Sequence, residues 1–133
     1  MADQLTEKII AAAIEVHKTL GAGLLELIYE EALCHEFGLM DMNYQRQFAV
    51  DVIYKDHVIH GQRLDLLVEN EVVVEVKSLR SLPEIATAQL LSYLKATGLK
   101  RGLLLNFGET QLIKGIKRIS LCTLWLNEFS MLI

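Results

Sequence analysis

The pattern of hydrophobic and polar residues changes its period along the chain, and the first change separates two predicted helices from a predicted sheet. Apolar residues recur at helical spacing over residues 5–20, and a second helix is expected from about Leu24 to Phe37. Gly21 and Gly38 follow these two segments, and glycine commonly stands where a helix ends. The first forty residues are therefore expected to form two consecutive helices.

Residues 46–77 are expected to form three antiparallel strands. Apolar and polar positions alternate over residues 46–54, which is typical of a strand with one buried face. Two short polar turns separate this strand from two further apolar segments, residues 58–68 and residues 72–77. Because turns this short join neighbouring antiparallel strands, the three segments predict a β-meander.

The last third of the chain predicts one helix and one or two strands. Pro83 stands where a first-turn proline belongs, and residues 84–97 suit a helix. The short apolar run of residues 102–107 indicates a buried strand, and residues 117–122 are a candidate for a final strand. This mixed order of helices and strands predicts an α/β sandwich around one sheet.

Composition places the chain among compact single domains. It has 133 residues, of which 52% are hydrophobic and 23% charged, so its apolar content is too high for a disordered chain. It has no run of about 18 apolar residues and no secretory-signal pattern at its N-terminus. The two cysteines, Cys34 and Cys122, lack the spacing of a disulfide framework or a zinc site. These features predict a cytoplasmic protein without membrane contact.

Charge is distributed unevenly along the chain. Lys and Arg number 13 against 17 Asp and Glu, and the net charge of −4 argues against general coating of nucleic acid. Residues 1–40 carry seven acidic and two basic side chains, whereas residues 81–133 carry three acidic and six basic. An anionic partner is expected to contact the C-terminal part, and a solvated basic face is the alternative. The six basic residues there are Lys95, Lys100, Arg101, Lys114, Lys117 and Arg118.

Two acidic residues and a lysine stand in otherwise apolar predicted strands. Glu75 and Lys77 lie on the same face of their strand, because side chains alternate with a period of two. If Val68 pairs with Val72 across the turn, then Asp65 lies opposite Glu75, with Cβ atoms about 4.5–5.5 Å apart. Carboxylates this close repel each other unless one takes a proton or a cation binds between them.

Two carboxylates beside a lysine suit a divalent cation and an anionic transition state. Carboxylate oxygens are donors that Mg²⁺ and Mn²⁺ prefer. A neighbouring lysine orients a water molecule or stabilises negative charge. The alternative interpretation is an ordinary cross-strand ion pair of Asp65 or Glu75 with Lys77, and spacing alone leaves both open.

Two of the predicted helices carry polar residues that share a face. Gln89 and Tyr93 are four residues apart, and Glu26 and Tyr29 are three residues apart. For the Gln89–Tyr93 pair, the alternative is a satisfied polar edge of a packed helix.

These residues form motifs that occur in the order of a known family. Asp65 with residues 75–77, EVK, resembles the D…(D/E)xK signature of the PD-(D/E)XK nuclease superfamily. Residues 89–93, QLLSY, resemble the QxxxY motif of its RecB-like exonuclease branch, and residues 23–29, GLLELIY, match GxxExxY, the motif that names a small bacterial branch. The resemblance covers about residues 5–120. It implies an α/β fold, a restriction-endonuclease-like sandwich with a central mixed β-sheet flanked by helices and the core order α-β-β-β-α-β.

The resemblance also implies a metal site. Asp65 and Glu75 would coordinate Mg²⁺ or Mn²⁺, with the backbone carbonyl of Val76 as a further ligand. Glu26 would complete the metal shell directly or through water. Lys77 would position the attacking water and offset charge in the transition state.

The remaining site residues are implied on the helix after the third strand. Gln89 and Tyr93 would hold the substrate strand or brace the site, and Lys95 would contact the substrate. The proline that precedes the first acid in the superfamily is replaced here by Leu64.

The function implied by the resemblance is hydrolysis of DNA or RNA phosphodiester bonds by a divalent-metal-dependent nuclease. Two alternatives remain open. One is a catalytically silent, nuclease-like module for binding or assembly. The other is a subunit that needs a larger protein partner to bind its substrate.

The chain is expected to divide into a nuclease-like domain, residues 1–120, and an apolar tail, residues 121–133. The tail has a single charged residue, and its large side chains are costly to leave in water. It is expected to pack on the domain or at a subunit contact. Because the sheet and helices already hold enough apolar residues for a core, we expect a homodimer or larger assembly. The large apolar side chains are Leu121, Leu124, Trp125, Leu126, Phe129, Met131, Leu132 and Ile133.

Overall fold

Two helices begin the chain, as the apolar periodicity predicts. In the computed structural model, which describes residues 3–121, α1 spans Gln4–Leu20 and α2 spans Glu26–Leu39. The side chain of Asp3 caps α1 by accepting a hydrogen bond from a first-turn N–H at 2.8 Å. Gly21, with φ +73°, follows the last residue of α1 as predicted.

The second helix begins and ends two residues later than predicted. The Tyr29 hydroxyl accepts a hydrogen bond from the N–H of Leu24 at 3.1 Å and donates one to the carbonyl of Gly21 at 2.5 Å. These bonds hold the start of the predicted helix in a turn. At the other end, α2 continues through Gly38, and Asp41, with φ +56°, takes the left-handed conformation expected of a glycine.

Five strands form one mixed sheet in the order β1 (Tyr44–Tyr54), β2 (His57–Val68), β3 (Val72–Lys77), β4 (Arg101–Asn106) and β5 (Ile116–Ser120). The antiparallel meander β1–β2–β3 is confirmed, with Val68 opposite Val72. Helix α3 (Glu84–Thr97) connects β3 to the parallel strand β4, and β5 returns antiparallel to β4 after a short 3₁₀ helix, Leu112–Gly115. The α/β fold with the order α-β-β-β-α-β is therefore confirmed, with one helix more before it and one strand more after it.

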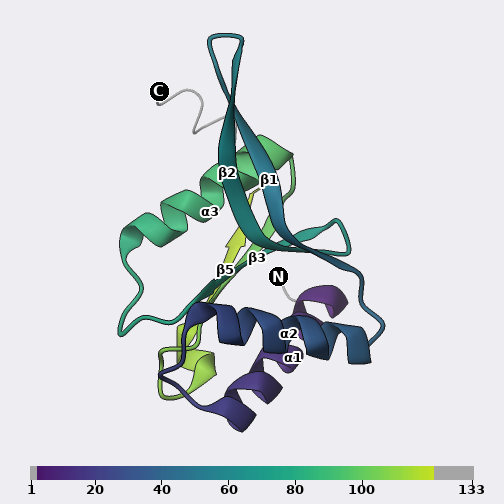
Figure 1. Ribbon diagram of the computed structural model, residues 1–133, viewed down its shortest axis with the longest axis vertical. Helices are drawn as coiled ribbons and strands as arrows, with labels where there is room; N and C mark the ends of the chain where they lie inside the picture. Colours follow the sequence, from purple (N-terminus) through teal and green to yellow (C-terminus); the bar gives the residue numbers. More distant parts are fainter. Residues whose placement is uncertain (1–2, 122–133) are drawn as a thin grey trace.

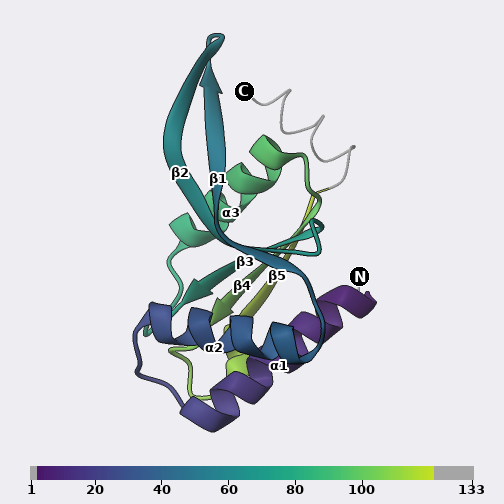
Figure 2. The ribbon, with the colours of Figure 1, turned by 45° about the vertical axis from the view of Figure 1, so that its right-hand side comes forward.

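The sheet lies between two layers of helices. Helices α1 and α2 cover one face, and α3 covers the other (Figures 1 and 2). Val72, Val74 and Val76 belong to the core beneath α1 and α2, whereas Val73 belongs to the core beneath α3. Because side chains alternate along a strand, Glu75 and Lys77 are directed toward the α3 side of the sheet.

Strands β1 and β2 extend beyond the sheet as a two-stranded hairpin arm, residues 51–60 (Figures 1 and 2). Its turn residues, Lys55 and Asp56, both have positive φ, which matches the right-handed twist of a hairpin. The arm exposes a set of large apolar side chains to solvent in the described part of the chain. These are Val52, Ile53, Tyr54, Val58 and Ile59.

The predicted apolar tail lies outside the described residues except for Leu121. The Leu121 side chain is 3% exposed and belongs to the core beneath α3, and its N–H donates to the carbonyl of Lys100 at 2.8 Å. The first residue of the tail thus packs on its own domain. Among residues 3–121, no helix is long and apolar enough to cross a membrane.

Candidate active site

Strands β2 and β3 separate at the position of the two predicted acids. Their ladder ends at the pair Leu66–Val74. Beyond it, the N–H of Asp65 donates to Oε2 of Glu75 at 2.7 Å, and the N–H of Val76 donates to Oδ2 of Asp65 at 2.8 Å. Each carboxylate accepts a backbone N–H of the opposite strand. The two acids therefore face each other across the separated strands.

Burial makes this pair of acids costly to ionise. Glu75 is only 3% exposed, and its burial, together with the negative charge of Asp65, raises the pKa of Glu75 to about 8. Burial also raises the pKa of Asp65. Two adjacent carboxyl groups whose pKa values are both raised favour a shared proton or a bound cation over two free charges.

Lys77 lies on the same face as Glu75 but forms no ion pair with either acid in the described structure. The interpretation of an ordinary cross-strand ion pair is therefore wrong for this geometry. The positive charge of Lys77 still acts at longer range, since it opposes the rise in the pKa of both Asp65 and Glu75. Its side chain is half-buried and remains available to a ligand.

The segment after Lys77 is fixed by a buried asparagine on the neighbouring strand. Asn106 is fully buried, and its side chain accepts from the N–H of Leu79 at 2.9 Å and donates to the carbonyl of the same residue at 3.0 Å. The Asn106 side-chain oxygen also accepts from the N–H of Gly108 at 3.1 Å. These bonds hold the exit of β3 against β4.

Helix α3 contributes a tyrosine to the acids. Tyr93 is 2% exposed, and burial followed by the charges of Glu75 and Asp65 raises the pKa of Tyr93 to about 12. Gln89 lies one turn earlier on the same helix face and is half-buried. Lys95 is exposed and, two residues after Tyr93, lies on a different side of α3. The structure thus brings Tyr93 to the acids and directs Lys95 elsewhere.

On α2, Glu30 rather than the expected Glu26 is the acid whose charge acts on the two acids of the site. Glu26 is exposed at the first position of the helix, and no polar contact in the described chain involves it. Glu30, one turn later, is 3% exposed, and its charge contributes to the raised pKa of Asp65 and of Glu75. Glu30 lies four residues after Glu26 and so shares its helix face, and this spacing could have identified Glu30 from the sequence.

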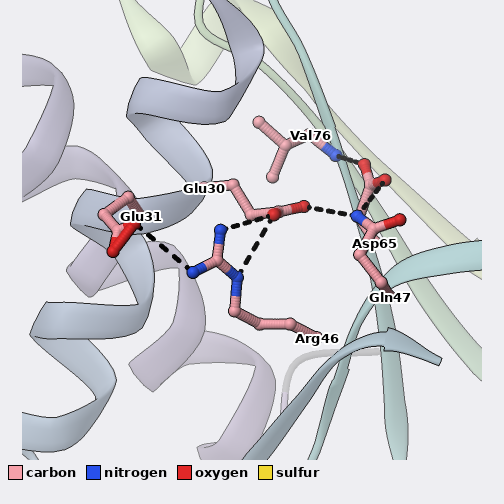
Figure 3. A network of polar contacts seen from close by, with 6 residues as sticks. All are labelled: Glu30, Glu31, Arg46, Gln47, Asp65 and Val76. Carbon is pink, nitrogen blue, oxygen red and sulfur yellow. Dashed lines mark hydrogen bonds and ion pairs between the residues drawn. The ribbon is translucent and has the colours of Figure 1, made fainter.

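Glu30 reaches Asp65 through a glutamine (Figure 3). The Gln47 amide donates to Oε1 of Glu30 at 3.0 Å and to Oδ1 of Asp65 at 3.5 Å. Arg46 approaches the other oxygen of Glu30, with its Nη2 at 2.8 Å from Oε2. Neither Gln47 nor Arg46 was predicted from the sequence.

Tyr29, the last residue of the GxxExxY segment, packs in the core. Its ring is fully buried and stacks on Phe107 with centroids 4.5 Å apart, while its hydroxyl holds the turn before α2. The hydroxyl of Ser78 donates to the carbonyl of Leu24 at 2.6 Å, which ties this turn to the residues after Lys77. The start of α2, with Glu26, is therefore fixed at the Lys77 end of the site.

The basic surface expected near the C-terminus is partly neutralised. Arg101 forms ion pairs with Asp3 at 2.6 Å and Glu71 at 2.7 Å, and Arg118 forms one with Glu7 at 3.3 Å. Arg101 and Arg118 therefore have acidic partners, which sequence position alone did not reveal because the partners come from distant segments.

The site supplies oxygen donors for a divalent cation. Asp65 and Glu75 each accept one backbone N–H, which leaves further lone pairs on both carboxylates. Among residues 3–121, no three His, Cys, Asp or Glu side chains are placed to hold a metal ion by themselves. The donor set fits a hard cation such as Mg²⁺ whose remaining ligands are water, backbone carbonyl or phosphate oxygens.

A comparison with protein families shows where the chain belongs. A family model described as PD-(D/E)XK nuclease superfamily matches residues 3–119. The chain belongs to this superfamily. Its nucleases generally use divalent metal ions. The residues that resemble its D…(D/E)xK signature, Asp65, Glu75 and Lys77, lie where strands β2 and β3 separate.

Other comparisons add little. Among solved structures, the chain is similar to the crystal structure of SSO0001, with a TM-score of 0.48 and 18% sequence identity over 99% of this chain and 88% of that chain. A likeness at this level carries no argument about function. A search of curated proteins finds no match.

Proposed function

We propose that the protein is a divalent-metal-dependent nuclease that hydrolyses phosphodiester bonds of DNA or RNA. One observation carries this proposal. Asp65 and Glu75 face each other at the opening between β2 and β3, and Lys77 lies beside them without an ion-pair partner in the described structure. The match of Gly23–Tyr29 to the GxxExxY motif supports placing the chain in that bacterial branch of the superfamily.

Asp65 and Glu75 would hold Mg²⁺ or Mn²⁺, together with the backbone carbonyl of Val76. When bound there, the cation stabilises negative charge that develops on a phosphate group. The Lys77 ammonium would donate hydrogen bonds to the attacking water and to the reacting phosphate. Glu26, at the Lys77 end of the site, is proposed to contact the cation through water.

On α3, Tyr93 would brace the acids, because its buried ring lies close enough for both charges to act on its hydroxyl. Gln89, one turn away, would contact the substrate strand. Lys95 would contact a more distant part of the substrate, since it lies on another side of the helix. Each role remains a prediction.

The first prediction is metal-dependent cleavage. Purified protein is expected to cleave single- or double-stranded DNA or RNA with Mn²⁺ or Mg²⁺, and to lose this activity with a chelator. Lys77→Ala is expected to remove cleavage while the protein stays folded, whereas Lys18→Ala, an exposed lysine on α1, should leave it unchanged. Gel assays with end-labelled strands measure both.

The same assay separates the alternatives. Binding of nucleic acid without cleavage under any metal condition would identify a silent binding module. Cleavage that appears only after a second protein is added would identify a subunit of a larger nuclease. The neutralised arginines on the C-terminal surface are the observation that favours such a partner.

We also propose that the protein is a homodimer whose contact includes the apolar tail. The hairpin arm adds exposed apolar surface that a single described chain leaves uncovered. Truncation after Leu121, which keeps that buried side chain, is expected to give a folded monomer in light scattering. A full-length protein that is monomeric at micromolar concentration would rule out this assembly.

A further inference from the structure

We propose that Gln47 is a positioning residue for the carboxylate of Asp65, and that Glu30 and Arg46 hold Gln47 in place. The inference rests on the proposed function, in which Asp65 is a ligand of a divalent cation. It assigns a task to three side chains that the superfamily signature does not contain.

The two oxygens of Asp65 have separate donors. Oδ2 accepts from the N–H of Val76 at 2.8 Å, and Oδ1 lies 3.5 Å from the amide nitrogen of Gln47 (Figure 3). Two donors on different oxygens define the rotation of the carboxylate about its last torsion. Because each carboxylate oxygen has a second lone pair, both oxygens keep an acceptor site for a cation. Without Gln47, the single hydrogen bond from Val76 would leave the carboxylate freer to rotate about its last torsion.

Glu30 is the anchor for this amide. Its side chain is buried, and its oxygens are already occupied by Gln47 at 3.0 Å and by Arg46, whose Nη2 and Nε lie 2.8 and 3.3 Å from Oε2. A buried carboxylate requires such partners, because unpaired charge is costly away from water. With both oxygens engaged, Glu30 acts on Asp65 through Gln47.

The backbone of β1 changes conformation at this residue. Gln47 has φ +50°, a left-handed conformation that is rare for residues other than glycine, asparagine and aspartate. The β1–β2 ladder pairs the residues on either side of Gln47 with β2 but not Gln47 itself. Unfavourable backbone of this kind persists where surrounding contacts require it. The contacts at Gln47 are the hydrogen bonds from its amide to Glu30 and Asp65 and a hydrogen bond from Nη1 of Arg63 to its backbone carbonyl at 3.2 Å.

Calorimetry with Mn²⁺ tests the inference on the full chain. Gln47→Gly and Gln47→Met both remove the amide, but glycine suits the left-handed backbone and methionine does not. Both variants are expected to bind Mn²⁺ about tenfold more weakly than the wild type. Loss of a residue that orients a metal ligand typically weakens metal binding by about 10–100-fold, and the smaller loss is expected here because Gln47 is exposed to solvent. At saturating Mn²⁺, the rate of cleavage should return to within about twofold of the wild type, as expected when ligand positioning alone is lost.

Two controls make the result decisive. Gln45→Gly and Gln45→Met change the same residue type two positions earlier, where the amide donates to Asn70 at 3.4 Å, and should not alter Mn²⁺ binding. The double variant Asp65→Ala, Glu75→Ala should abolish binding. If the double variant binds like the wild type, the proposed metal site is wrong.

If binding needs the two acids but the Gln47 variants bind normally, the role of Gln47 is overturned while the metal site stands. A loss seen with only one of the two Gln47 substitutions would assign the effect to the backbone and would also overturn it. A loss in both variants, with the melting temperature of Gln47→Gly maintained, supports the inference.

Discussion

Glu75→Gln is expected to stabilise the metal-free protein strongly above pH 8. The pKa of Glu75 is about 8 in the folded protein against 4.5 for an ordinary glutamate, because the side chain is buried beside Asp65. Between these two values the unfolded chain gives up its proton and the folded chain retains it, so wild-type stability falls as the pH rises. The difference corresponds to roughly 4–5 kcal/mol once the pH exceeds 8.

The neutral amide in Glu75→Gln has no proton to lose, so its stability lacks this decline. Urea unfolding at pH 5 and pH 8.5 measures the effect. The variant and the wild type should differ little at pH 5 and by several kcal/mol at pH 8.5. Glu15→Gln, which changes an exposed acid on α1, controls for the change in net charge.

Mn²⁺ provides a second comparison for this prediction. A cation that binds the folded state stabilises it, so Mn²⁺ should raise the stability of the wild type at pH 8.5 and have little effect on Glu75→Gln. A variant that is less stable than the wild type in metal-free buffer at pH 8.5 would show that ionised Glu75 contributes a favourable structural contact instead.

The acids could be predicted because their placement depends on local rules. A period of two assigns Glu75 and Lys77 to one face, and a short turn determines which residue of β2 lies opposite Glu75. Both rules use residues within about a dozen positions of each other. In the structure the β2–β3 ladder ends at Leu66–Val74, one pair short of the two acids, but Asp65 and Glu75 still accept one hydrogen bond each from the other's strand.

The parts that were missed depend on contacts between distant segments. Glu30 becomes a partner of Gln47 because α2 docks on the sheet, and Gln47 makes this contact from a left-handed backbone that the sequence does not indicate. The basic surface was overestimated for the same reason, since Asp3 of the N-terminal cap pairs with Arg101. Sequence spacing carries no information on which face of a helix meets which strand 15 or more residues away.

Asn106→Ala is expected to destabilise the protein by about 3 kcal/mol or more, and to impair the site from a distance. The Asn106 amide makes three hydrogen bonds in a fully buried position, two to Leu79 and one to Gly108. Removing it leaves buried backbone groups without partners, and each such group costs about 1–3 kcal/mol.

The functional consequence follows from the register of the sheet. Asn106 pairs with Lys77 across β3 and β4, and its side chain holds the residues that follow Lys77. Loss of these bonds frees the exit of β3, so cleavage should fall even at a temperature where the variant is folded. Urea unfolding and the cleavage assay at low temperature measure the two effects. Asn43→Ala, in an exposed position before β1, should change stability by no more than about 0.5 kcal/mol. Equal unfolding midpoints for the two variants would show that the buried amide does not stabilise this junction.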